Sequence, residues 1–420
     1  MENDIKQKAE YCLNCKNPQC RTGCPLENNI PGFIQKVKED NLEEAYKILC
    51  ETTVIPALCG RICPHQKQCQ GKCIRGIKSQ AVSIGELEAY VGDWALDNSD
   101  ILLNCWGDIQ EKSKKVAIVG GGPSGLTAAA FLRKSGYQVT IYEKQEDLGG
   151  ILKRGIPEFR LTNEIVEKTI KQILSLGIKV QCKKELGKNL NLADLEKEYN
   201  AIYLSIGANV PKKMVIEGEE LNGVYGGNSL LENQNHPDYT NKKVAIIGGG
   251  NVAMDCARTI KKMGAAQVVV IYRRSEAEMP AEVKEIADAK KEGVEFLFLN
   301  NIVKILGTNK VEQIECIKTE LVQKEGETRK YPVNIENSNY IMDMDYVIMA
   351  VGGEAEKELI ESCNINMTPK KYIQVNEQNQ TSNKKVFAGG DVTGQNSTVA
   401  WAASDGKKAA RHIIEYLEKQ

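Results

Sequence analysis

The chain has 420 residues and a formal net charge of -1, with 42% hydrophobic and 26% charged residues. This length is enough for two or three domains, and the composition is that of an ordinary globular protein. The balanced charge excludes a broad basic surface for nucleic acid. No apolar run is long enough to span a membrane, and the first residues lack the apolar core of a signal peptide. A cytoplasmic protein is therefore expected.

The chain contains 14 cysteines, and they are distributed unevenly. Nine fall between Cys12 and Cys73, and the rest are scattered singly along the chain. A secreted disulfide scaffold would be smaller and would follow a signal peptide. The dense region therefore predicts a metal site, and the scattered cysteines are expected to be small core residues. The scattered cysteines are Cys105, Cys182, Cys256, Cys316 and Cys363.

The first hundred or so residues are predicted to form helices and loops. Residues 30–51 have apolar side chains at helical spacing, with an interruption near Asp40 and Asn41. Residues 83–96 predict another helix, with Ser83 as its N-cap and Glu86 three residues further on, as in a capping box. The polar run 107–115 is expected to be a linker to the next domain.

Two dense cysteine runs occupy this helical region, "CLNCKNPQCRTGCP" and "CGRICPHQKQCQGKC". Their cysteines are Cys12, Cys15, Cys20, Cys24, Cys59, Cys63, Cys69 and Cys73. Disulfides, zinc and iron–sulfur clusters are the candidates. A lone C-x2-C pair would be ordinary for zinc. However, C-x2-C-x4-C-x3-C-P is close to a ferredoxin run, in which the fourth cysteine serves the other cluster of a pair.

The segment "KVAIVGGGPSGLTAAAFLRKSGYQVTIYEK" predicts a strand, a Gly-rich turn, a helix and a second strand. In this dinucleotide fingerprint, Gly120 permits the tight turn and Gly122 allows close approach of a pyrophosphate. Gly125 lets the helix pack on the strand. The second strand ends at Glu143, whose carboxylate can accept hydrogen bonds from ribose hydroxyls. A dinucleotide with free ribose hydroxyls is therefore expected here.

The segment "KKVAIIGGGNVAMDCARTIKKMGAAQVVVIYRR" predicts a second unit of the same kind. Its fingerprint residues are Gly248, Gly250 and Ala253, and its second strand ends in Arg273 and Arg274 instead of an acid. Two guanidinium groups at this position can pair with the 2′-phosphate of NADP(H). The second unit is therefore expected to bind NADP(H), with surface arginines as the alternative interpretation.

The remaining strands indicate how the two units are connected. Residues 201–208 and 346–353 are buried strands ending in glycine, and each could close the sheet of one domain. Asp391 follows a glycine pair near the end of the chain and could hold a ribityl hydroxyl of a flavin. A helix beginning near Ser397–Thr398 would direct its positive end toward the flavin ring. The last segment therefore returns to the first nucleotide domain.

The predicted fold class is α/β, with two Rossmann-like domains for FAD and NADPH, the second inserted in the first, preceded by an α-helical iron–sulfur domain. The expected boundaries are 1–112 for the helical domain, 113–235 and 353–420 for the two parts of the FAD domain, and 236–352 for the NADPH domain. A flavin that accepts a hydride needs an outlet for single electrons, which zinc cannot provide. Two [4Fe–4S] clusters are therefore favoured over zinc.

Together these motifs resemble the small (beta) subunit family of NADPH-dependent glutamate synthase. They are also similar to the large subunit of NADH-dependent ferredoxin:NADP oxidoreductase and to the N-terminal half of dihydropyrimidine dehydrogenase. The motifs that carry the resemblance are "CLNCKNPQCRTGCP", "CGRICP", "CQGKCIRGIK", "VSIGELE", "GGGPSGLTAA", "GGILKRGIPEFRL", "GGGNVAMD", "YRRSEAEMP" and "FAGGDV". They cover nearly the full chain and are specific in combination.

The resemblance implies a crossed set of cluster ligands. One cluster would be held by Cys12, Cys15, Cys20 and Cys73, and the other by Cys24, Cys63, Cys69 and Glu88. Glu86 is the rival of Glu88, and Cys50 and Cys59 are left as non-ligands. The candidate FAD residues are Gly120, Gly122, Pro123, Ser124, Gly125, Glu143, Lys144, Gly150, Arg160, Leu186, Gly390, Asp391, Thr398 and Val399. The candidate NADPH residues are Gly248, Gly250, Asn251, Val252, Ala253, Arg273, Arg274, Ala350, Val351 and Gly352.

The expected activity is transfer of electrons from NADPH through FAD and two clusters to a partner, with no catalytic side-chain acid or base. The expected partner is a glutamate synthase large subunit, with ferredoxin or another carrier as the alternative. A non-catalytic scaffold that keeps cofactors only for folding is disfavoured by the intact fingerprints. The cluster region and two nucleotide domains account for the chain, so no glutamate-forming site is expected in it.

Overall fold

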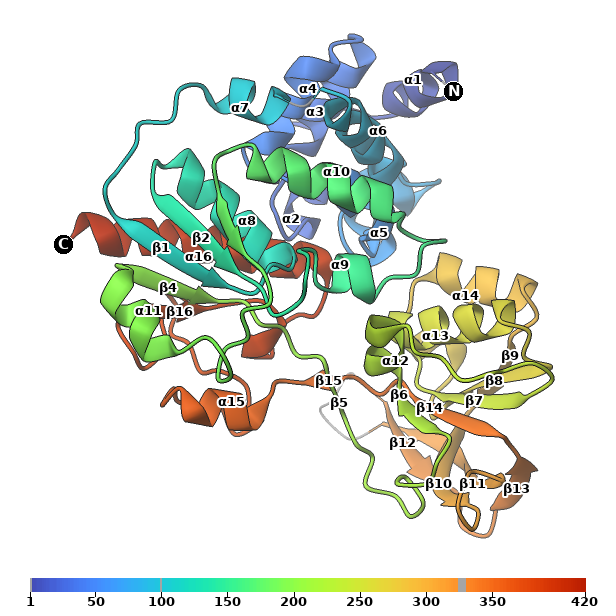
Figure 1. Ribbon diagram of the computed structural model, residues 1–420. Helices are drawn as coiled ribbons and strands as arrows, with labels where there is room; N and C mark the ends of the chain where they lie inside the picture. Colours follow the sequence, from blue (N-terminus) through green and yellow to red (C-terminus); the bar gives the residue numbers. More distant parts are fainter. Residues whose placement is uncertain (1, 99, 324–329) are drawn as a thin grey trace. The chain divides into compact units, whose positions relative to one another are not determined.

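The computed structural model describes residues 2–98, 100–323 and 330–420. It forms two compact units: unit 1 contains residues up to Ala208 and from Ala355 onward, and unit 2 contains Asn209–Glu354 (Figure 1). Within the part of the chain that the structure describes, no helix combines the length and apolarity needed to cross a membrane.

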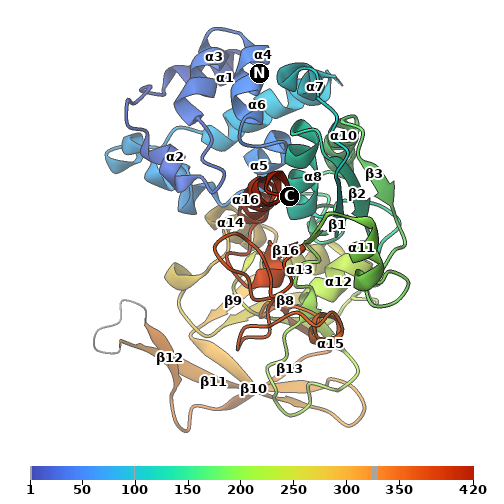
Figure 2. The ribbon, with the colours of Figure 1, turned by 90° about the vertical axis from the view of Figure 1, so that its left-hand side faces the viewer.

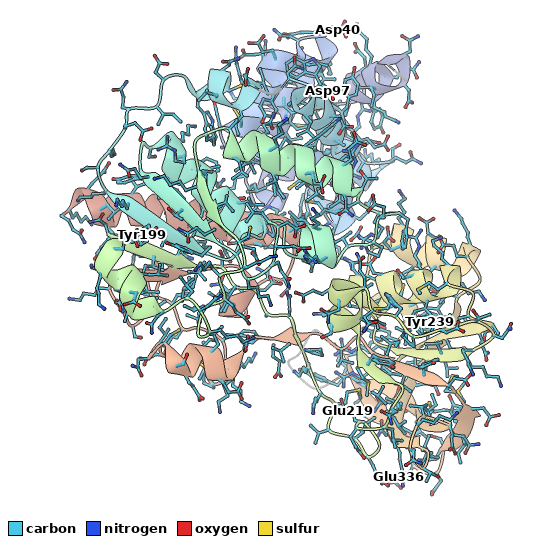
Figure 3. All side chains as sticks on the ribbon, in the orientation of Figure 1. Asp40, Asp97, Tyr199, Glu219, Tyr239 and Glu336 are labelled. Atoms are coloured by element: carbon cyan, nitrogen blue, oxygen red, sulfur yellow. The ribbon has the colours of Figure 1, made fainter. Side chains whose placement is uncertain are left out.

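Unit 1 begins with a layer of helices that carries the cysteine runs. These elements are α1 (Glu2–Glu10), α2 (Gln19–Gly23), α3 (Ile30–Lys38), α4 (Leu42–Cys50), α5 (Pro56–Ile62), η1 (His65–Lys67), η2 (Gln70–Lys72), η3 (Ile74–Ile77), α6 (Ile84–Leu96) and α7 (Ile101–Trp106). The predicted interruption near Asp40 is confirmed, because Asn41 caps α4 by accepting from the backbone N–H of Glu44 at 3.1 Å. Asp40, labelled in Figure 3, lies in the turn before this cap and pairs with Lys6 at 2.5 Å.

The predicted capping box of α6 is wrong. Ser83 occupies the N-cap position, but its side chain makes no capping hydrogen bond. Glu86 instead pairs with Lys8 of α1 at 2.5 Å. An ion pair between two helices has replaced the local contact, and a sequence pattern cannot reveal such a partner.

The rest of unit 1 is built on a five-stranded parallel sheet. Its strands are β1 (Lys115–Val119), β2 (Gln138–Tyr142), β3 (Lys179–Gln181), β4 (Ala201–Leu204) and β16 (Val386–Ala388), in the order β16-β4-β1-β2-β3. The accompanying helices are α8 (Pro123–Lys134), α9 (Ile151–Arg154), α10 (Asn163–Leu174), α11 (Leu192–Glu198), α15 (Lys357–Ser362), η5 (Asp391–Thr393) and α16 (Val399–Glu418). The predicted strand at 201–208 lies inside the sheet, between β1 and β16, so the sheet is completed by the returning end of the chain.

The helical layer shares one apolar core with this α/β part of unit 1. The hydroxyl of Tyr46 in α4 donates to Gln172 of α10 at 3.1 Å, and the Gln172 amide donates to the carbonyl oxygen of Ala95 at 2.9 Å. Figure 2 shows the layer covering α8, α10 and α16. The two parts of unit 1 are therefore held by buried packing as well as by the chain between them.

Unit 2 contains a second five-stranded parallel sheet. Its strands are β6 (Val224–Gly226), β7 (Lys243–Ile247), β8 (Gln267–Tyr272), β9 (Glu295–Phe298) and β14 (Tyr346–Met349), in the order β6-β14-β7-β8-β9. Its helices are α12 (Gly227–Asn233), α13 (Asn251–Lys262), η4 (Glu276–Glu278) and α14 (Val283–Lys291). The division at 235 drawn from the sequence differs from this arrangement. β6 pairs with β14, so residues before 235 already belong to the second sheet.

The other strands of unit 2 form an antiparallel sheet and a short ribbon. The sheet contains β10 (Asn300–Leu306), β11 (Gln313–Val322), β12 (Tyr331–Asn334) and β13 (Tyr340–Asp343). In the ribbon, β5 (Val210–Pro211) pairs with β15 (Gly353–Glu354). The chain therefore enters and leaves unit 2 through two adjacent antiparallel strands.

Candidate cofactor sites

The turn between β1 and α8 has the geometry expected of a dinucleotide fingerprint. Gly120 has φ +105°, and a Cβ there would lie 2.4 Å from the carbonyl oxygen of Ser205. A Cβ on Gly125 would lie 2.0 Å from the carbonyl oxygen of Gly120. A Cβ on Gly122, in contrast, would meet nothing within 4 Å. Two glycines are therefore required by close packing, and Gly122 faces open space where a pyrophosphate could approach.

Glu143 follows β2 and is only 5% exposed. Its Oε2 accepts from the backbone N–H of Gly121 at 2.7 Å, and its Oε1 accepts from the N–H of Gln145 at 2.9 Å. These bonds hold the carboxylate beside the Gly-rich turn, where the sequence predicted a ribose contact. The same bonds make Glu143 part of the turn's own structure.

Several other FAD candidates lie around this turn. Pro123 and Ser124 open α8, and the Ser124 hydroxyl is 2.7 Å from that of Tyr203. A Cβ on Gly150 would lie 3.1 Å from the Cα of Gly122, and one on Gly390 would lie 3.2 Å from the Cβ of Ser124. Gly150 and Gly390 therefore border the fingerprint from two distant parts of the chain.

Three further FAD candidates lie in other surroundings. Lys144 is exposed, and Arg160 is half-buried in the loop after α9. Leu186 is buried in an apolar cluster that includes Tyr142 and Leu195. Their assignment to the cofactor remains a proposal from the sequence.

The last segment of unit 1 brings an acidic group to the start of α16. Burial, followed by the charge of Asp405, raises the pKa of Asp391 to about 6. Asp405 itself accepts from the backbone N–H of Gly390 at 3.0 Å. Thr398 caps α16 by accepting from the N–H of Trp401 at 3.3 Å, and Val399 is the first residue of this helix. The helix therefore begins where the sequence predicted.

The fingerprint of unit 2 repeats this geometry. Gly248 has φ +140°, and a Cβ there would lie 2.3 Å from the carbonyl oxygen of Ala350. A Cβ on Gly250 would meet only Pro280, at 4.0 Å. Ala253 is fully buried in α13, so a methyl group fits where unit 1 requires Gly125. Val351 and Gly352 follow Ala350 at the end of β14, and Gly352 has open space around it.

The two arginines after β8 differ in environment. Arg273 is exposed, whereas Arg274 is only 8% exposed. The Nε of Arg274 is buried and has no hydrogen-bond partner among the residues that the structure describes. A buried guanidinium nitrogen with an unused donor is costly unless an anion completes its hydrogen bonding. The donor therefore fits the 2′-phosphate of NADP(H).

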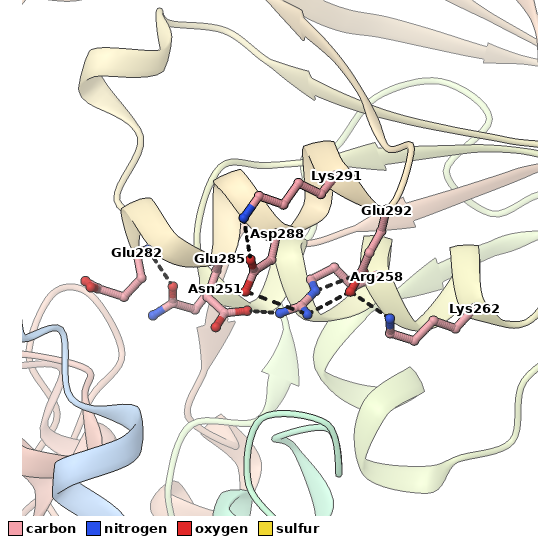
Figure 4. Close-up of polar contacts among 8 residues, drawn as sticks. All are labelled: Asn251, Arg258, Lys262, Glu282, Glu285, Asp288, Lys291 and Glu292. Carbon is pink, nitrogen blue, oxygen red and sulfur yellow. Dashed lines mark hydrogen bonds and ion pairs between the residues drawn. The ribbon is translucent and has the colours of Figure 1, made fainter. Parts of the chain in front are cut away.

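A network of charges supports this site and was not predicted from the sequence (Figure 4). Arg258 of α13 pairs with Glu285 of α14 and with Glu292 at 2.8 Å, and Lys262 pairs with Glu292 at 2.7 Å. Asn251, at the start of α13, accepts from the backbone N–H of Glu282 at 2.9 Å. These contacts fix α13 and its N-terminus against α14. Val252 follows Asn251 and is half-buried.

The first group of cysteines combines both runs. Burial, followed by the nearby thiols of Cys73 and Cys12, raises the pKa of Cys20 to about 11. Arg75 lies 4.1 Å from the ring centroid of Tyr11 and donates to the Tyr11 carbonyl oxygen at 3.0 Å, which holds the two runs together. Cys15 is partly exposed between Cys12 and Cys20. Cys20 therefore lies near a cysteine of each run, and the crossed ligand pattern stays a prediction from the resemblance.

The second group surrounds a buried carboxyl. Glu88 is 5% exposed, and Asn28 donates to its Oε1 at 3.1 Å. Burial raises the pKa of Glu88 to about 8. Burial and then Glu88 raise the pKa of Cys24 to about 12, and the same two causes raise that of Cys69. The pKa of Cys63 is raised first by a hydrogen bond with Cys59 and also by Glu88. These thiols and the Glu88 carboxyl would lose their protons on binding a metal and become buried negative charges. Buried charges are normally paired or bound to metal, so the group fits a cationic ligand.

Two observations bear on the ligand assignments. Glu86 is engaged by Lys8 on the surface, whereas Glu88 lies among the thiols. Cys59 hydrogen-bonds the thiol of Cys63, so it lies in the same surroundings although we predicted it to be a non-ligand. Within the described residues, no three His, Cys, Asp or Glu side chains are arranged to hold a single metal ion. Ligands of a four-iron cluster bind different corners and need not converge on one point.

Comparisons with known proteins find separate family matches for the nucleotide-binding part and for the cysteine-rich N-terminal part of the chain. Residues 114–406 match the pyridine nucleotide-disulphide oxidoreductase family, and residues 1–100 match the family of dihydropyrimidine dehydrogenase domain II, 4Fe-4S cluster. The small chain of NADPH glutamate synthase from Halomonas elongata is 34% identical, and the match covers 99% of this chain and 91% of that protein. The beta subunit of NADP(+)-dependent formate dehydrogenase from Moorella thermoacetica is 32% identical, with 95% of this chain and 60% of that protein covered.

Among solved structures, Mycobacterium tuberculosis FprA in complex with NADPH superimposes with a TM-score of 0.65. It is 19% identical, and the match covers 73% of this chain and 85% of that chain, so this likeness concerns the fold alone. The chain belongs to the family of glutamate synthase small chains and related oxidoreductases. It is therefore an NADPH-dependent flavoprotein oxidoreductase that uses FAD and 4Fe-4S chemistry.

Proposed function

We propose that this chain is the cytoplasmic electron-input subunit of a larger complex, and that the complex is a glutamate synthase. When bound, NADPH, FAD and two [4Fe–4S] clusters supply hydride transfer followed by single-electron transfer to the partner. The observation that carries the proposal is the presence, within unit 1, of a dinucleotide turn and two separate groups of candidate cluster ligands.

The chain's own residues would bind and orient these groups. Cys12, Cys15, Cys20 and Cys73 would hold one cluster, and Cys24, Cys63, Cys69 and Glu88 the other. Gly122 would admit the FAD pyrophosphate, with Glu143 positioned for the ribose. Arg274 would bind the 2′-phosphate of NADPH, assisted by Arg273. None of these roles requires a side chain that exchanges a proton with the substrate.

The surface next to the first cysteine group supports a protein acceptor. Leu13, Ile74 and Ile77 are 54%, 52% and 76% exposed, and they stand beside Cys12 and Cys73. Residues 11–26 and 52–85 contain no Asp or Glu, and they include seven cations: Lys16, Arg21, Arg61, Lys67, Lys72, Arg75 and Lys78. Exposed apolar side chains in segments rich in cations suit a partner with acidic residues around its own electron-accepting site.

The cluster assignment is tested by comparing two carboxylates on α6. Glu88→Ala should leave the second cluster labile, so that iron and acid-labile sulfide fall from about eight to about four per chain after anaerobic purification. Glu86→Ala, which removes only a surface ion pair, should retain the wild-type content. Equal iron, sulfide and visible spectra in both variants would refute the role of Glu88. Wild-type protein with about four irons would refute two clusters.

The electron-input function is tested with the purified chain and its partner. The chain alone should oxidise NADPH with a small artificial acceptor but form no glutamate from 2-oxoglutarate and glutamine. Adding the glutamate synthase large subunit from the same cell should produce glutamate, and Lys72→Glu should weaken this coupled reaction without slowing dye reduction. Glutamate formation by the chain alone, or a failure to couple with that large subunit, would contradict the proposal.

A second candidate function comes from the relative in formate metabolism. That relative is the beta subunit of an NADP(+)-dependent formate dehydrogenase, and the two sequences are 32% identical. In this alternative, the chain would exchange electrons between NADP(H) and another redox protein. Mass spectrometry of the partner that copurifies with the native protein distinguishes the two candidates.

A further inference from the structure

Two cysteines outside both candidate cluster groups meet in the helical layer. Cys50 is the last residue of α4, and Cys105 lies in α7, shortly before the linker to β1. Their side chains interact with each other, and the Cys50 thiol also donates to the carbonyl oxygen of Lys47 at 3.3 Å. The indole Nε1 of Trp106 donates to the Cys50 carbonyl oxygen at 3.1 Å, which independently holds α7 against the end of α4.

The two thiols have unequal surroundings. Cys50 is 1% exposed, whereas Cys105 is partly exposed. The hydrogen bond from Cys50, assisted by the charge of Lys47, lowers the pKa of Cys105 against the effect of its partial burial. The same hydrogen bond, followed by burial, raises the pKa of Cys50. Cys105 is therefore the thiol that solvent reaches first, and the lowered pKa favours its thiolate over that of buried Cys50.

A second cation borders the pair. The Nζ of Lys134 lies 4.8 Å from the ring centroid of Trp106, and that ring packs on Phe131 at 5.7 Å between centroids. Cationic surroundings, partial exposure and an adjacent second thiol are the features of cysteines that react with oxidants. Cys363, whose pKa is also raised by burial, has the hydroxyl of Ser362 beside it and not a second thiol, within the described residues.

We propose that Cys105 and Cys50 are a redox modification site that forms an intramolecular disulfide on reaction with a small disulfide such as oxidised glutathione. The Cys105 thiolate attacks one sulfur of the small disulfide, forming a mixed disulfide and releasing a thiolate. The Cys50 sulfur then attacks the Cys105 sulfur, and the second small thiol leaves with the Cys50 proton. Two protein thiols are oxidised, and one small disulfide is reduced to two thiols.

The disulfide would close a covalent loop over residues 50–105. This loop contains Cys63, Cys69, Cys73 and Glu88, which are half of the candidate cluster ligands. It would also fix α7 to α4 at the point where the chain leaves the helical layer. The modification therefore links the oxidation state of the surroundings to the part of the chain proposed to hold the clusters.

The test uses the full chain, purified anaerobically with its iron, and treated with oxidised glutathione. After alkylation of the remaining thiols, peptide mapping should find Cys50 and Cys105 joined, with the intact mass lower by two hydrogens and the iron content unchanged. Cys50→Ser should instead accumulate one glutathione on Cys105. Cys105→Ser should react roughly tenfold more slowly or not at all, because its remaining thiol is buried and protonated. Cys363→Ser serves as the control and should behave as the wild type.

Several outcomes would overturn the proposal. A disulfide between other cysteines with iron retained, no glutathione adduct on Cys105 in Cys50→Ser, or equal reactivity of the two single variants would each do so. If Cys50→Ser does not fold, alkylation of the wild-type protein under limiting reagent decides the matter. Cys105 should be labelled before Cys50, and the reverse order would contradict the assignment.

Discussion

The two dinucleotide turns are built alike, but the residues that follow their second strands differ. In unit 1 the carboxylate of Glu143 accepts hydrogen bonds from two backbone N–H groups of the protein. In unit 2, within the described part of the chain, the buried Nε of Arg274 is left with no hydrogen-bond partner. The first turn is therefore pre-organised by its own acid, whereas the second has a buried donor that the described residues leave unused. Substitution of Glu143 should destabilise the first turn, whereas substitution of Arg274 should weaken only ligand binding at the second.

The largest effect is expected at Gly125, where close packing in the first turn leaves no room for a side chain. Gly125→Val would place side-chain carbon about where the carbonyl oxygen of Gly120 lies, since even a Cβ would be 2.0 Å from it. The protein should lose FAD entirely and unfold at a lower temperature. Gly122→Ala is the matched control, because its Cβ has open space. It should keep the unfolding temperature of the apoprotein and lose only FAD affinity, measured by flavin fluorescence. Unchanged FAD binding in Gly122→Ala would mean that the pyrophosphate lies elsewhere.

The second effect sharpens the contrast at unit 2. Arg274→Ala should raise the Michaelis constant for NADPH by roughly 10- to 100-fold, since a hydrogen bond to a charged group is worth about 1.5–3 kcal/mol. The constant for NADH should barely change. Arg273→Ala is the comparison, and it should give a smaller increase because the exposed guanidinium is screened by water. Equal use of NADPH and NADH by the wild-type protein would contradict the role of both arginines.

The smallest effect is expected at Glu143. Glu143→Gln would turn one acceptor into an amide donor that faces a backbone N–H, and it should destabilise unit 1 by about 1–3 kcal/mol. Chemical unfolding of the apoprotein measures this loss, which should be present without any nucleotide. Arg274→Ala, measured in the same way, should leave stability unchanged or improved. If both variants were equally stable and differed only in binding, the distinction between the two turns would fail.

The sequence was informative where the signal is local. Both strand–turn–helix units, the interruption near Asp40 and the helix after Thr398 follow from glycine spacing, capping residues and periodicity. The placement of β6 in the second sheet could not be predicted, because a three-residue edge strand is defined by its pairing with β14. The Ser83 capping box failed for a similar reason, since Lys8 lies far away in sequence from Glu86.

The candidate sites show the same difference between local sequence signals and contacts made by residues far apart in the chain. Gly120, Gly248 and the arginines after β8 were found from motifs. The burial of Glu88 among thiols followed only from the family resemblance, and nothing in "GELEAY" separates it from Glu86. The Arg258 network and the Cys50–Cys105 pair were missed entirely. Complementary charges on α13 and α14 could have suggested the first, but a contact between α4 and α7 leaves no local signature.

The ribbon of β5 and β15 has a consequence for how such a protein can be assembled. Because Val210–Pro211 pairs with Gly353–Glu354, the two ends of unit 2 meet at one place. In terms of chain connectivity, the whole nicotinamide unit is a very long loop that starts and finishes at neighbouring points. Removing or exchanging such a loop leaves only a short gap to bridge, and the entropy of closing that gap grows slowly with the length inserted. The residues proposed to select NADPH are thus carried on a separate segment, which recombination could replace without changing the sequence of unit 1.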